Sequence, residues 1–543
     1  MKYLPLLFAL LCLSIHSKEV KETVEVEARI YYSNEGTWSI VTENFDETKA
    51  YVAKAFYDKK FEEYGWDELH ITTNKIFSDQ LQAEAAGRIE GYLTKDRILY
   101  HYENLLSIQG ELSYKEKAFF NKQRDFILEE YARNPYEPHI YNAYLIYLQF
   151  KGMVDEYNNQ QTEFNRISET NFNLMAAFGD MIEIHDKYRQ NRKRFDDMTA
   201  EELKLYFFLN SHCSALFKVK ADMSEVFSAH NSWYYYSMMN RIFKEYNFNY
   251  NHPSVKAKSV IFSSYAATLS SNDDFYVTSN DLNVIETTNV FFNDTFLEEI
   301  VPESLLTWQR VIIANRMSET GEEWSSHFSP YNSGTYNNMY MVLDMKNIDL
   351  DNNSINNKTL FTVEQIPNLV KANDVTKQLR YGYWPSYNTP YDKEIIARSL
   401  IQEKIKEMPQ LVHEFDYDTC TRATIMRRDQ AKISSIDDMK TFIRYNNYTN
   451  DPLAFGDPTA TISARGDLME KQLCYGAYDA KVASVREIKG KKKTIHVVAG
   501  PTYSDVEPFD FTKVDGCTKM KRHGLKEGPM TFEWFTVETK FEA

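Results

Sequence analysis

A cysteine and a histidine stand at a spacing that could place them side by side. Cys213 precedes the stretch SALFKV, which predicts a buried strand, and His230 follows seventeen residues later near the end of a second strand, EVFSAHNSW. A strand, a turn and a strand of this length would return His230 to Cys213. A thiol beside a histidine can act as a nucleophile, but a small, buried cysteine at a strand start is the simpler interpretation of this pair alone.

Several common catalytic motifs are missing from the chain. It contains no G-x-S-x-G, so the nucleophile elbow of ordinary lipases and esterases is excluded. It contains no G-x-x-x-x-G-K-[ST], and His413-Glu414 lacks the second histidine of a H-E-x-x-H zinc site. The residues around Cys213 do not match the papain-like cysteine motif. We therefore expect neither a metal nor a cofactor.

Length and charge limit the class of protein further. With 543 residues, the chain exceeds one ordinary domain, and 43% hydrophobic with 26% charged residues is typical of a folded globular protein. The formal net charge is −16. Because such a surface repels phosphate backbones, we expect no nucleic-acid partner.

The first 17 residues, MKYLPLLFALLCLSIHS, have the pattern of a secretory signal peptide. No later apolar run is long enough to predict a second membrane anchor. We therefore expect a secreted or lysosomal protein whose mature chain begins near Lys18. Four Asn-x-Ser/Thr sequons fit glycosylation on this route, although chance is the alternative in a chain rich in Asn, Ser and Thr: Asn293, Asn352, Asn357 and Asn447.

Removal of the signal leaves four cysteines, Cys213, Cys420, Cys474 and Cys517. Four cysteines in a chain of this size do not make a disulfide scaffold, so the core must supply the stability. Cys474 and Cys517 could form one disulfide, but the sequence does not decide the pairing. Cys213 lies far from the other three and is the candidate free thiol.

Hydrophobic patterning predicts a mixed arrangement of helices and strands. Residues 24–56 alternate apolar and polar side chains and predict strands, whereas Asp79 to Phe164 has the spacing of several helices. After Ser224 the chain is dominated by strand-like segments, so we expect a large sheet system in its C-terminal two-thirds. Arg189 to Arg194 predicts either an exposed, protease-sensitive loop or a solvated helix face.

Long motifs in a fixed order then identify a family resemblance. From Cys213 onward these are CSAL with AHNSW, FSSYAATLSSNDDFYV, VPESLLTWQRVIIANRM, YNSGTYNNMYMVLD, TVEQIP, GYWPSYNTPY, TRATIMRRDQ, IRYNNYTNDPL, ISARGDL, YDAKVAS and AGPT. The chain resembles the phospholipase B-like family, closest to its phospholipase B-like 1 branch. The match covers Cys213 to about residue 515 and, more weakly, the helical N-terminal part. One departure is Thr461 to Ala464, where relatives carry cysteines.

The resemblance implies a fold and a maturation step. The family belongs to the N-terminal nucleophile hydrolases, whose α+β fold is an αββα sandwich, here with a helical N-terminal portion. The resemblance implies self-cleavage between His212 and Cys213, giving fragments 18–212 and 213–543 that stay associated. The freed α-amino group would serve as the base for the Cys213 thiol.

Further site residues follow from the same motifs. His230 and Trp233 match A-H-x-x-W and would line the pocket, although His230 could be a satisfied core histidine. Asn388 is our candidate oxyanion-hole donor, and a turn former before Pro390 is its alternative. Arg422 matches a family active-site arginine.

The resemblance implies release of fatty acyl chains from glycerophospholipids, which would require transient contact with a membrane surface. A thiol nucleophile also attacks amides. The alternatives are therefore an amidase acting on N-acyl lipids or peptides, and a non-catalytic glycoprotein that binds lipid.

Overall fold

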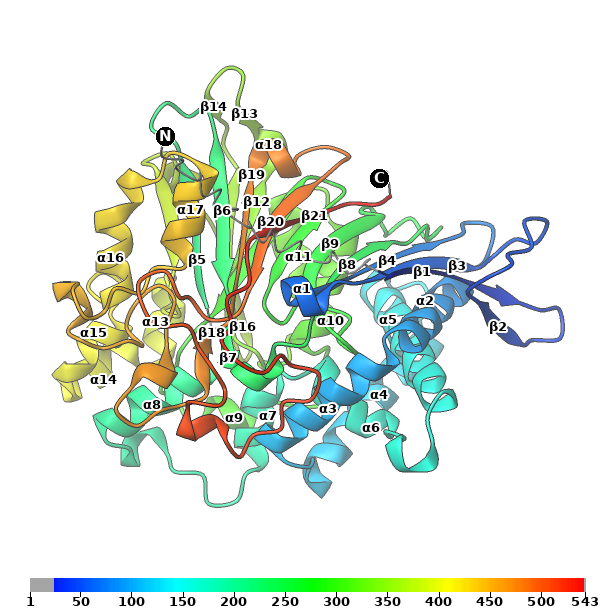
Figure 1. Cartoon of the computed structure of the whole chain (residues 1–543), viewed down its shortest axis with the longest axis horizontal. Coiled ribbons are helices and arrows are strands. Elements are labelled where there is room, and N and C mark those ends of the chain that lie inside the picture. The colour runs from blue at the N-terminus through cyan, green and yellow to red at the C-terminus, as the bar shows by residue number, and fades with distance from the viewer. Residues whose placement is uncertain (1–23, 212, 542–543) are drawn as a thin grey trace, which may run out of the picture.

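Two large β-sheets and several groups of helices make up the protein (Figure 1). The structure is a computed structural model that describes residues 24–211 and 213–541. The predicted signal peptide, residues 1–17, and His212 lie outside the described residues.

The larger sheet contains eleven strands, and its N-terminal part begins the fold. The predicted strands in residues 24–56 are confirmed as β1 (Val24–Tyr32), β2 (Trp38–Val41) and the start of β3 (Ala53–Lys59). A fourth strand, β4 (Trp66–Thr73), pairs in parallel with β8 (Arg241–Asn247). The sheet system therefore also includes the N-terminal strands, which corrects the prediction that confined it to the C-terminal two-thirds.

The remaining strands of this sheet are antiparallel neighbours. The full order is β16-β15-β12-β11-β10-β9-β8-β4-β3-β1-β2. The strands not yet defined are β9 (Ser259–Tyr265), β10 (Phe275–Thr278), β11 (Leu282–Thr288), β12 (Asn338–Asp344), β15 (Leu360–Ile366) and β16 (Leu369–Asp374). These positions confirm the strand-like segments predicted after Ser224.

The second sheet has six strands in the order β17-β5-β6-β19-β20-β21. These are β17 (Tyr383–Ser386), β5 (Ser214–Val219), β6 (Val226–Asn231), β19 (Asp479–Ser484), β20 (Thr494–Ala499) and β21 (Phe535–Glu538). All of its neighbouring strands whose register is known run antiparallel. The strand that follows Cys213 lies inside this sheet and not at its edge.

Alternating side chains show how the two sheets pack. In β12, Met339 and Met341 join an apolar core shared with the six-stranded sheet, whereas Tyr340 and Val342 join the core under the helices. This period of two is what a strand with both faces buried requires. The larger sheet therefore lies between a helical layer and the smaller sheet.

Helices form the two outer layers. The predicted helical region is confirmed as α2 (Asp79–Leu93), α3 (Lys95–Gln109), α4 (Tyr114–Arg133) and α5 (Pro138–Asn159), which pack on the larger sheet together with α10 (Thr307–Met317). On the other side, α16 (Thr421–Asp429) and α17 (Ile436–Ile443) cover the smaller sheet. The chain thus has an α+β fold whose layers follow the order helix, sheet, sheet, helix.

Glycines allow α2 and α5 to approach closely. A Cβ at Gly87 would lie 1.8 Å from the carbonyl oxygen of Gln149, and one at Gly152 would lie 2.4 Å from that of Glu84. Larger side chains would separate the two backbones. The N-terminus of α4 is fixed by a capping box between Ser113 and Glu116.

The covalent and surface features bear on the sequence predictions. A disulfide joins Cys474 and Cys517, while Cys213 and Cys420 are both free and buried, so Cys213 is not the sole free thiol of the mature chain. Residues 189–194 form a largely exposed loop after α7 (Met181–Tyr188).

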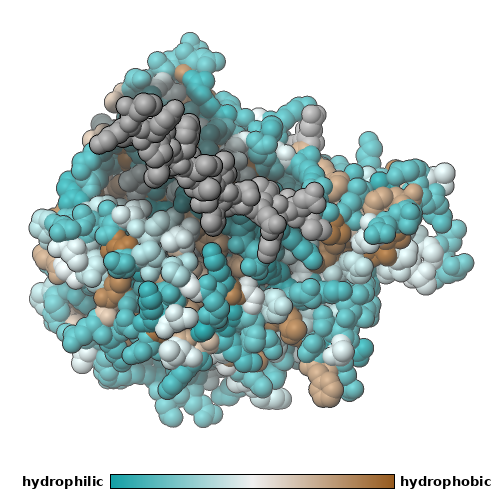
Figure 2. All heavy atoms as spheres, viewed as in Figure 1, coloured by the Kyte–Doolittle hydropathy of each residue, from teal (hydrophilic) through white to brown (hydrophobic). Residues whose placement is uncertain are grey.

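No helix in residues 24–211 or 213–541 is long and apolar enough to cross a bilayer. On the face in Figure 2, hydrophobic residues are scattered among hydrophilic ones.

Candidate active site

Cys213 lies immediately before β5 in a strained backbone conformation. Its φ is +95°, a region that residues with a Cβ rarely adopt, and its side chain is 1% exposed. The next residue, Ser214, donates its backbone N–H to Asn231 Oδ1 at 3.0 Å. Strain of this kind costs about 1–3 kcal/mol and is concentrated at functional sites. The site is therefore built where the six-stranded sheet begins.

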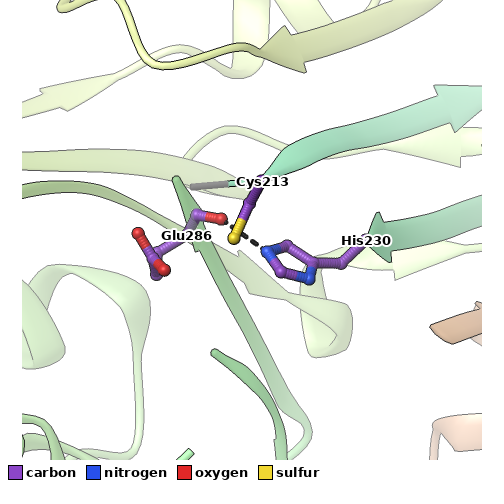
Figure 3. A group of neighbouring side chains, drawn as sticks. All are labelled: Cys213, His230 and Glu286. Carbon is purple, nitrogen blue, oxygen red and sulfur yellow. Dashed lines mark hydrogen bonds between the residues drawn. The ribbon is translucent and has the colours of Figure 1, made fainter. Parts of the chain in front are cut away.

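The predicted return of His230 to Cys213 is confirmed. Strands β5 and β6 are antiparallel, and their register pairs Ala215 with His230. The Cys213 thiol, a ring nitrogen of His230 and a carboxyl oxygen of Glu286 lie within 4.8 Å of one another (Figure 3). His230 Nε2 donates to the backbone carbonyl of Glu286 at 2.9 Å. Burial lowers the pKa of His230 well below its ordinary value of 6.5, so the ring is neutral.

Arg422, from α16, holds the backbone around Cys213. Its Nη1 donates to the carbonyl oxygen of Cys213 at 2.7 Å and to Ser214 Oγ at 3.2 Å. Its Nη2 donates to Tyr387 O and to Asn388 Oδ1 at 2.8 and 2.7 Å. The guanidinium lies 4.5 Å from the ring centroid of Trp233. Arg422 therefore connects three of the sequence-predicted positions, Cys213, Asn388 and Trp233.

Asn388 lies in the same cluster in a left-handed conformation, with φ of +68°. Its Nδ2 donates to the carbonyl oxygen of Thr288 at 2.7 Å, while its Oδ1 accepts from Arg422. The positive φ agrees with the turn-former interpretation. A role as oxyanion-hole donor stays a prediction.

Trp233 and Asn231 form the wall beside the thiol. Trp233 Nε1 donates to Asn231 Oδ1 at 2.8 Å, the same oxygen that accepts the N–H of Ser214. Asn231 Nδ2 donates to the carbonyl oxygens of Ile443 and Ile462. Asn231 is thus a structural anchor for the start of β5, and it holds the Trp233 ring in place.

A pair of buried carboxyl groups next to Cys213 was not singled out from the sequence. The hydroxyl of Tyr336 lies 3.0 Å from Asp274 Oδ2 and 3.1 Å from Glu286 Oε1. Burial raises the pKa of both carboxyl groups, to about 7 for Asp274, and the Asp274 carboxyl raises that of Glu286 further. The sequence feature that could have pointed to these two residues is the presence of acidic side chains inside apolar strand segments, SSNDDFYV and NVIETT.

A buried ion network lies behind the site and was also missed. Arg241 in β8 pairs with Asp273 and with Asp479, so it connects the two sheets. Lys481 pairs with Asp479 at 3.0 Å and donates to Ser232 Oγ at 2.6 Å. Burial lowers the pKa of Lys481 to about 8. The sequence feature that could have pointed to this network is the acidic and the basic residue within the apolar segment YDAKVAS.

The electrostatic surroundings keep the Cys213 thiol protonated in the intact chain. Burial and the nearby Glu286 carboxyl raise its pKa well above 9, and Lys481 opposes this only in part. The donor atoms of Cys213, His230 and Glu286 are close together. However, the Glu286 carboxyl is held by Tyr336, and His230 Nε2 by a carbonyl. These hydrogen bonds already engage the Glu286 carboxyl and His230 Nε2.

A cavity of about 250 Å³ opens next to this cluster, between α8 (Ala200–Asn210) and α16. Its walls include apolar side chains of α8 and α15 (Val412–Phe415), namely Phe207, Phe208 and Phe415, and the site residues Trp233, Asn388 and Arg422. The buried thiol is not among its walls. The predicted positions Cys213, His230, Trp233, Asn388 and Arg422 are thus brought together, and His212 lies outside the described residues.

Comparison with known proteins defines the class. The family model described as phospholipase B matches residues 53–537. The chain is 35% identical to phospholipase B of Crotalus adamanteus over 497 residues, covering 90% of this chain and 88% of that protein. It is also 35% identical to phospholipase B-like 1 of Homo sapiens over 499 residues, covering 90% and 87%. The chain belongs to the phospholipase B family, and the resemblance found in the sequence is confirmed.

Proposed function

We propose that this chain is a hydrolase that releases fatty acyl groups from glycerophospholipids, with Cys213 as its nucleophile. The family membership supports the reaction class, since the relatives are named phospholipase B and phospholipase B-like. The single observation that carries the nucleophile is local: a free thiol at the start of β5, with a positive φ and with its carbonyl held by Arg422.

In this proposal the chain cleaves itself between His212 and Cys213. The thiol attacks the preceding carbonyl, the acyl group moves from nitrogen to sulfur, and water hydrolyses the thioester. The product is an α-amino group on Cys213 with an ordinary pKa of about 7.7–8.0, able to accept the thiol proton during later turnovers. One residue then holds both nucleophile and base.

The sheet topology supports retention of the N-terminal fragment, residues 18–212. Strand β4, from that fragment, pairs along its length with β8, from the fragment 213–543. Separation of the fragments would leave both strand edges and their shared core in water. The order helix, sheet, sheet, helix, with Cys213 at a strand start, supports assignment to the N-terminal nucleophile hydrolases.

We assign the protein to the secretory route, as a secreted or lysosomal glycoprotein. The sequence pattern of residues 1–17 supports this, as does the exposure of the sequon residues Asn352 and Asn357. Asn293 and Asn447 are half-buried, which makes them poorer acceptors.

The first experiment determines the intact mass and N-terminal sequences of the purified protein beside two variants. Cys213→Ala should abolish a new N-terminus at Cys213. Cys420→Ala is the matched control, because it removes the other free, buried thiol, and it should leave cleavage unchanged. Cleavage that persists in Cys213→Ala overturns the proposed nucleophile.

The second experiment measures fatty-acid release by the cleaved protein from phospholipids and, separately, from N-acyl amides. Release from phospholipids alone supports the proposed reaction. Release from amides alone transfers the proposal to an amidase, which the same nucleophile would permit. No release from either panel by fully cleaved protein favours the non-catalytic glycoprotein.

A further inference from the structure

Self-cleavage needs a proton acceptor that the mature enzyme does not need. In the intact chain the nitrogen of Cys213 is part of a peptide bond, so no α-amino group exists to take the thiol proton. The thiol itself is protonated, because its burial beside Glu286 raises its pKa. Another group near Sγ must therefore accept the proton as the sulfur–carbon bond forms.

His230 lies equally near the thiol, but burial makes it a poor proton acceptor. Its Nε2 carries a hydrogen that is donated to the Glu286 carbonyl, and its Nδ1 has no hydrogen-bond partner among the described residues. Protonation would create an imidazolium with no exposed surface, which burial strongly disfavours. Arg422 is a cation at neutral pH, and Lys481, which pairs with Asp479, is a cation below its pKa of about 8, so neither can accept a proton at neutral pH.

The carboxyl groups of Asp274 and Glu286 have the position and the chemistry to accept the thiol proton. A Glu286 carboxyl oxygen lies within 4.8 Å of Cys213 Sγ (Figure 3). The hydroxyl of Tyr336 contacts both carboxyl groups, and burial together with the neighbouring Asp274 carboxyl raises the pKa of Glu286. Asp274 has a positive φ of 29°, a second strained position beside Cys213. Two carboxyls this close cannot both ionise, so the pair holds one or two protons.

We propose that the Asp274–Glu286 pair accepts the Cys213 thiol proton during self-cleavage and returns it to the Cys213 nitrogen. This rests on the proposed function. As the S–C bond forms, the S–H proton passes to the pair. As the C–N bond breaks, the proton passes to the nitrogen, which becomes the α-amine. The proton moves from sulfur to nitrogen with no net gain or loss, and water then cleaves the thioester to a carboxylic acid and the free thiol.

The Asp274–Glu286 pair can accept the thiol proton only when the two carboxyl groups together hold a single proton. The charged and titratable groups that face it are Cys213, His230, Asp273, Tyr276, Tyr336, Tyr340 and Lys481. Because burial raises the pKa of Asp274 to about 7, the pair is doubly protonated in acid and singly protonated above neutrality. Self-cleavage should therefore accelerate as the pH rises through about 7.

The test follows conversion of newly synthesised full-length chain into two fragments between pH 5 and 9. The wild-type rate should rise with a midpoint near 7. Glu286→Gln and Asp274→Asn should each slow cleavage by about 100-fold or more, and Asp274→Asn should also remove the midpoint. Glu286→Asp, which retains a carboxyl group, should preserve the pH dependence.

Glu364→Gln is the matched control. Glu364 is likewise fully buried with its pKa raised to about 7, but its partners are the backbone N–H groups of Tyr391 and Asp392 and the side-chain amide of Asn289. It should cleave at the wild-type rate with the wild-type pH profile. If Cys213→Ala still cleaves, the proposed function fails. If Cys213→Ala is inert while wild-type, Glu286→Gln and Asp274→Asn share one rate and one flat pH profile, the carboxyl pair is refuted and the nucleophile stands. The pH dependence of the wild-type self-cleavage rate tests the proposal even if a variant does not fold: a midpoint near 7 supports the carboxyl pair, and a flat profile refutes it.

Discussion

Acid should stabilise this protein, because several buried carboxyl groups keep their protons in the folded chain. Burial raises the pKa of Asp180 to about 6, of Asp274 and Glu364 to about 7, and of Glu183 to about 8. Between these values and the ordinary range near 4, the folded state binds protons that the unfolded chain has released. The free energy of unfolding must then rise as the pH falls through this window.

Glu183 gives the largest single contribution. It accepts hydrogen bonds from Tyr336 N at 2.8 Å and Asn337 Nδ2 at 2.9 Å, but complete burial outweighs them. From pH 8 to pH 5 its proton is worth about 4 kcal/mol, at about 1.36 kcal/mol per pH unit. The buried neutral histidine His101, whose pKa burial lowers to about 3, acts in the opposite direction below pH 6.5, by about 2 kcal/mol at pH 5. His230, whose pKa burial also lowers, acts in the same sense as His101. Four carboxyls outweigh two histidines, so several kcal/mol of net stabilisation should remain.

Melting temperatures at pH 8, 6.5 and 5 and constant ionic strength would measure this effect. Glu183→Gln, which mimics the neutral acid, should flatten the pH dependence. Glu322→Gln is the control, because that side chain is 60% exposed, and it should leave the slope unchanged. A melting temperature that is equal or lower at pH 5 than at pH 8 would refute the reasoning, as would an unchanged slope in Glu183→Gln.

Three further predictions concern the framework of the site. Asp479→Asn leaves the buried cations Arg241 and Lys481 short of a partner, and it should destabilise the fold by about 3–5 kcal/mol in chemical denaturation; a loss below 1 kcal/mol contradicts the network's role. Arg422→Met orphans the carbonyl of Cys213 and should lower both the melting temperature and the self-cleavage rate, whereas unchanged cleavage would show that Arg422 does not position the scissile region. Reduction of the Cys474–Cys517 disulfide, which closes a 43-residue separation, should cost about 4 kcal/mol, and an unchanged melting temperature in reductant would contradict this.

Local patterns predicted helices α2 to α5 and the strands after Ser224, but they missed strand β4 and the helices α8, α10, α16 and α17. Helices α2 to α5 and the strands after Ser224 repeat apolar residues at helical or strand spacing, which short-range reading detects. Strand β4 was missed because its sequence, WDELHITT, is buried yet carries Asp67, Glu68 and His70. These charges are satisfied by distant partners, including Arg97 and Glu245. No alternation of polar and apolar residues can reveal such a strand.

The site divides in the same way between local and distant contacts. Cys213 and His230 were predictable as neighbours because one hairpin connects them. Arg422 and Asn388 were found by resemblance to family motifs alone, since they come from distant segments. Glu286 and Asp274 reach the thiol from the larger sheet, and that packing cannot be deduced from the spacing of residues in the chain.

Backbone strain is the property of this site that sequence reading could not anticipate. Cys213, Asp274, Tyr336 and Asn388 all have positive φ. Arg422 hydrogen-bonds to Cys213 and Asn388, and Tyr336 hydrogen-bonds to Asp274. At Cys213 this strain bears on the self-cleavage reaction. The φ torsion of a residue exists only while a carbonyl precedes it, so cleavage before Cys213 would remove that torsion and release about 1–3 kcal/mol. The packing that enforces this conformation would therefore favour cleavage over rejoining, and it would leave the new N-terminus anchored by the Arg422 contact to its carbonyl.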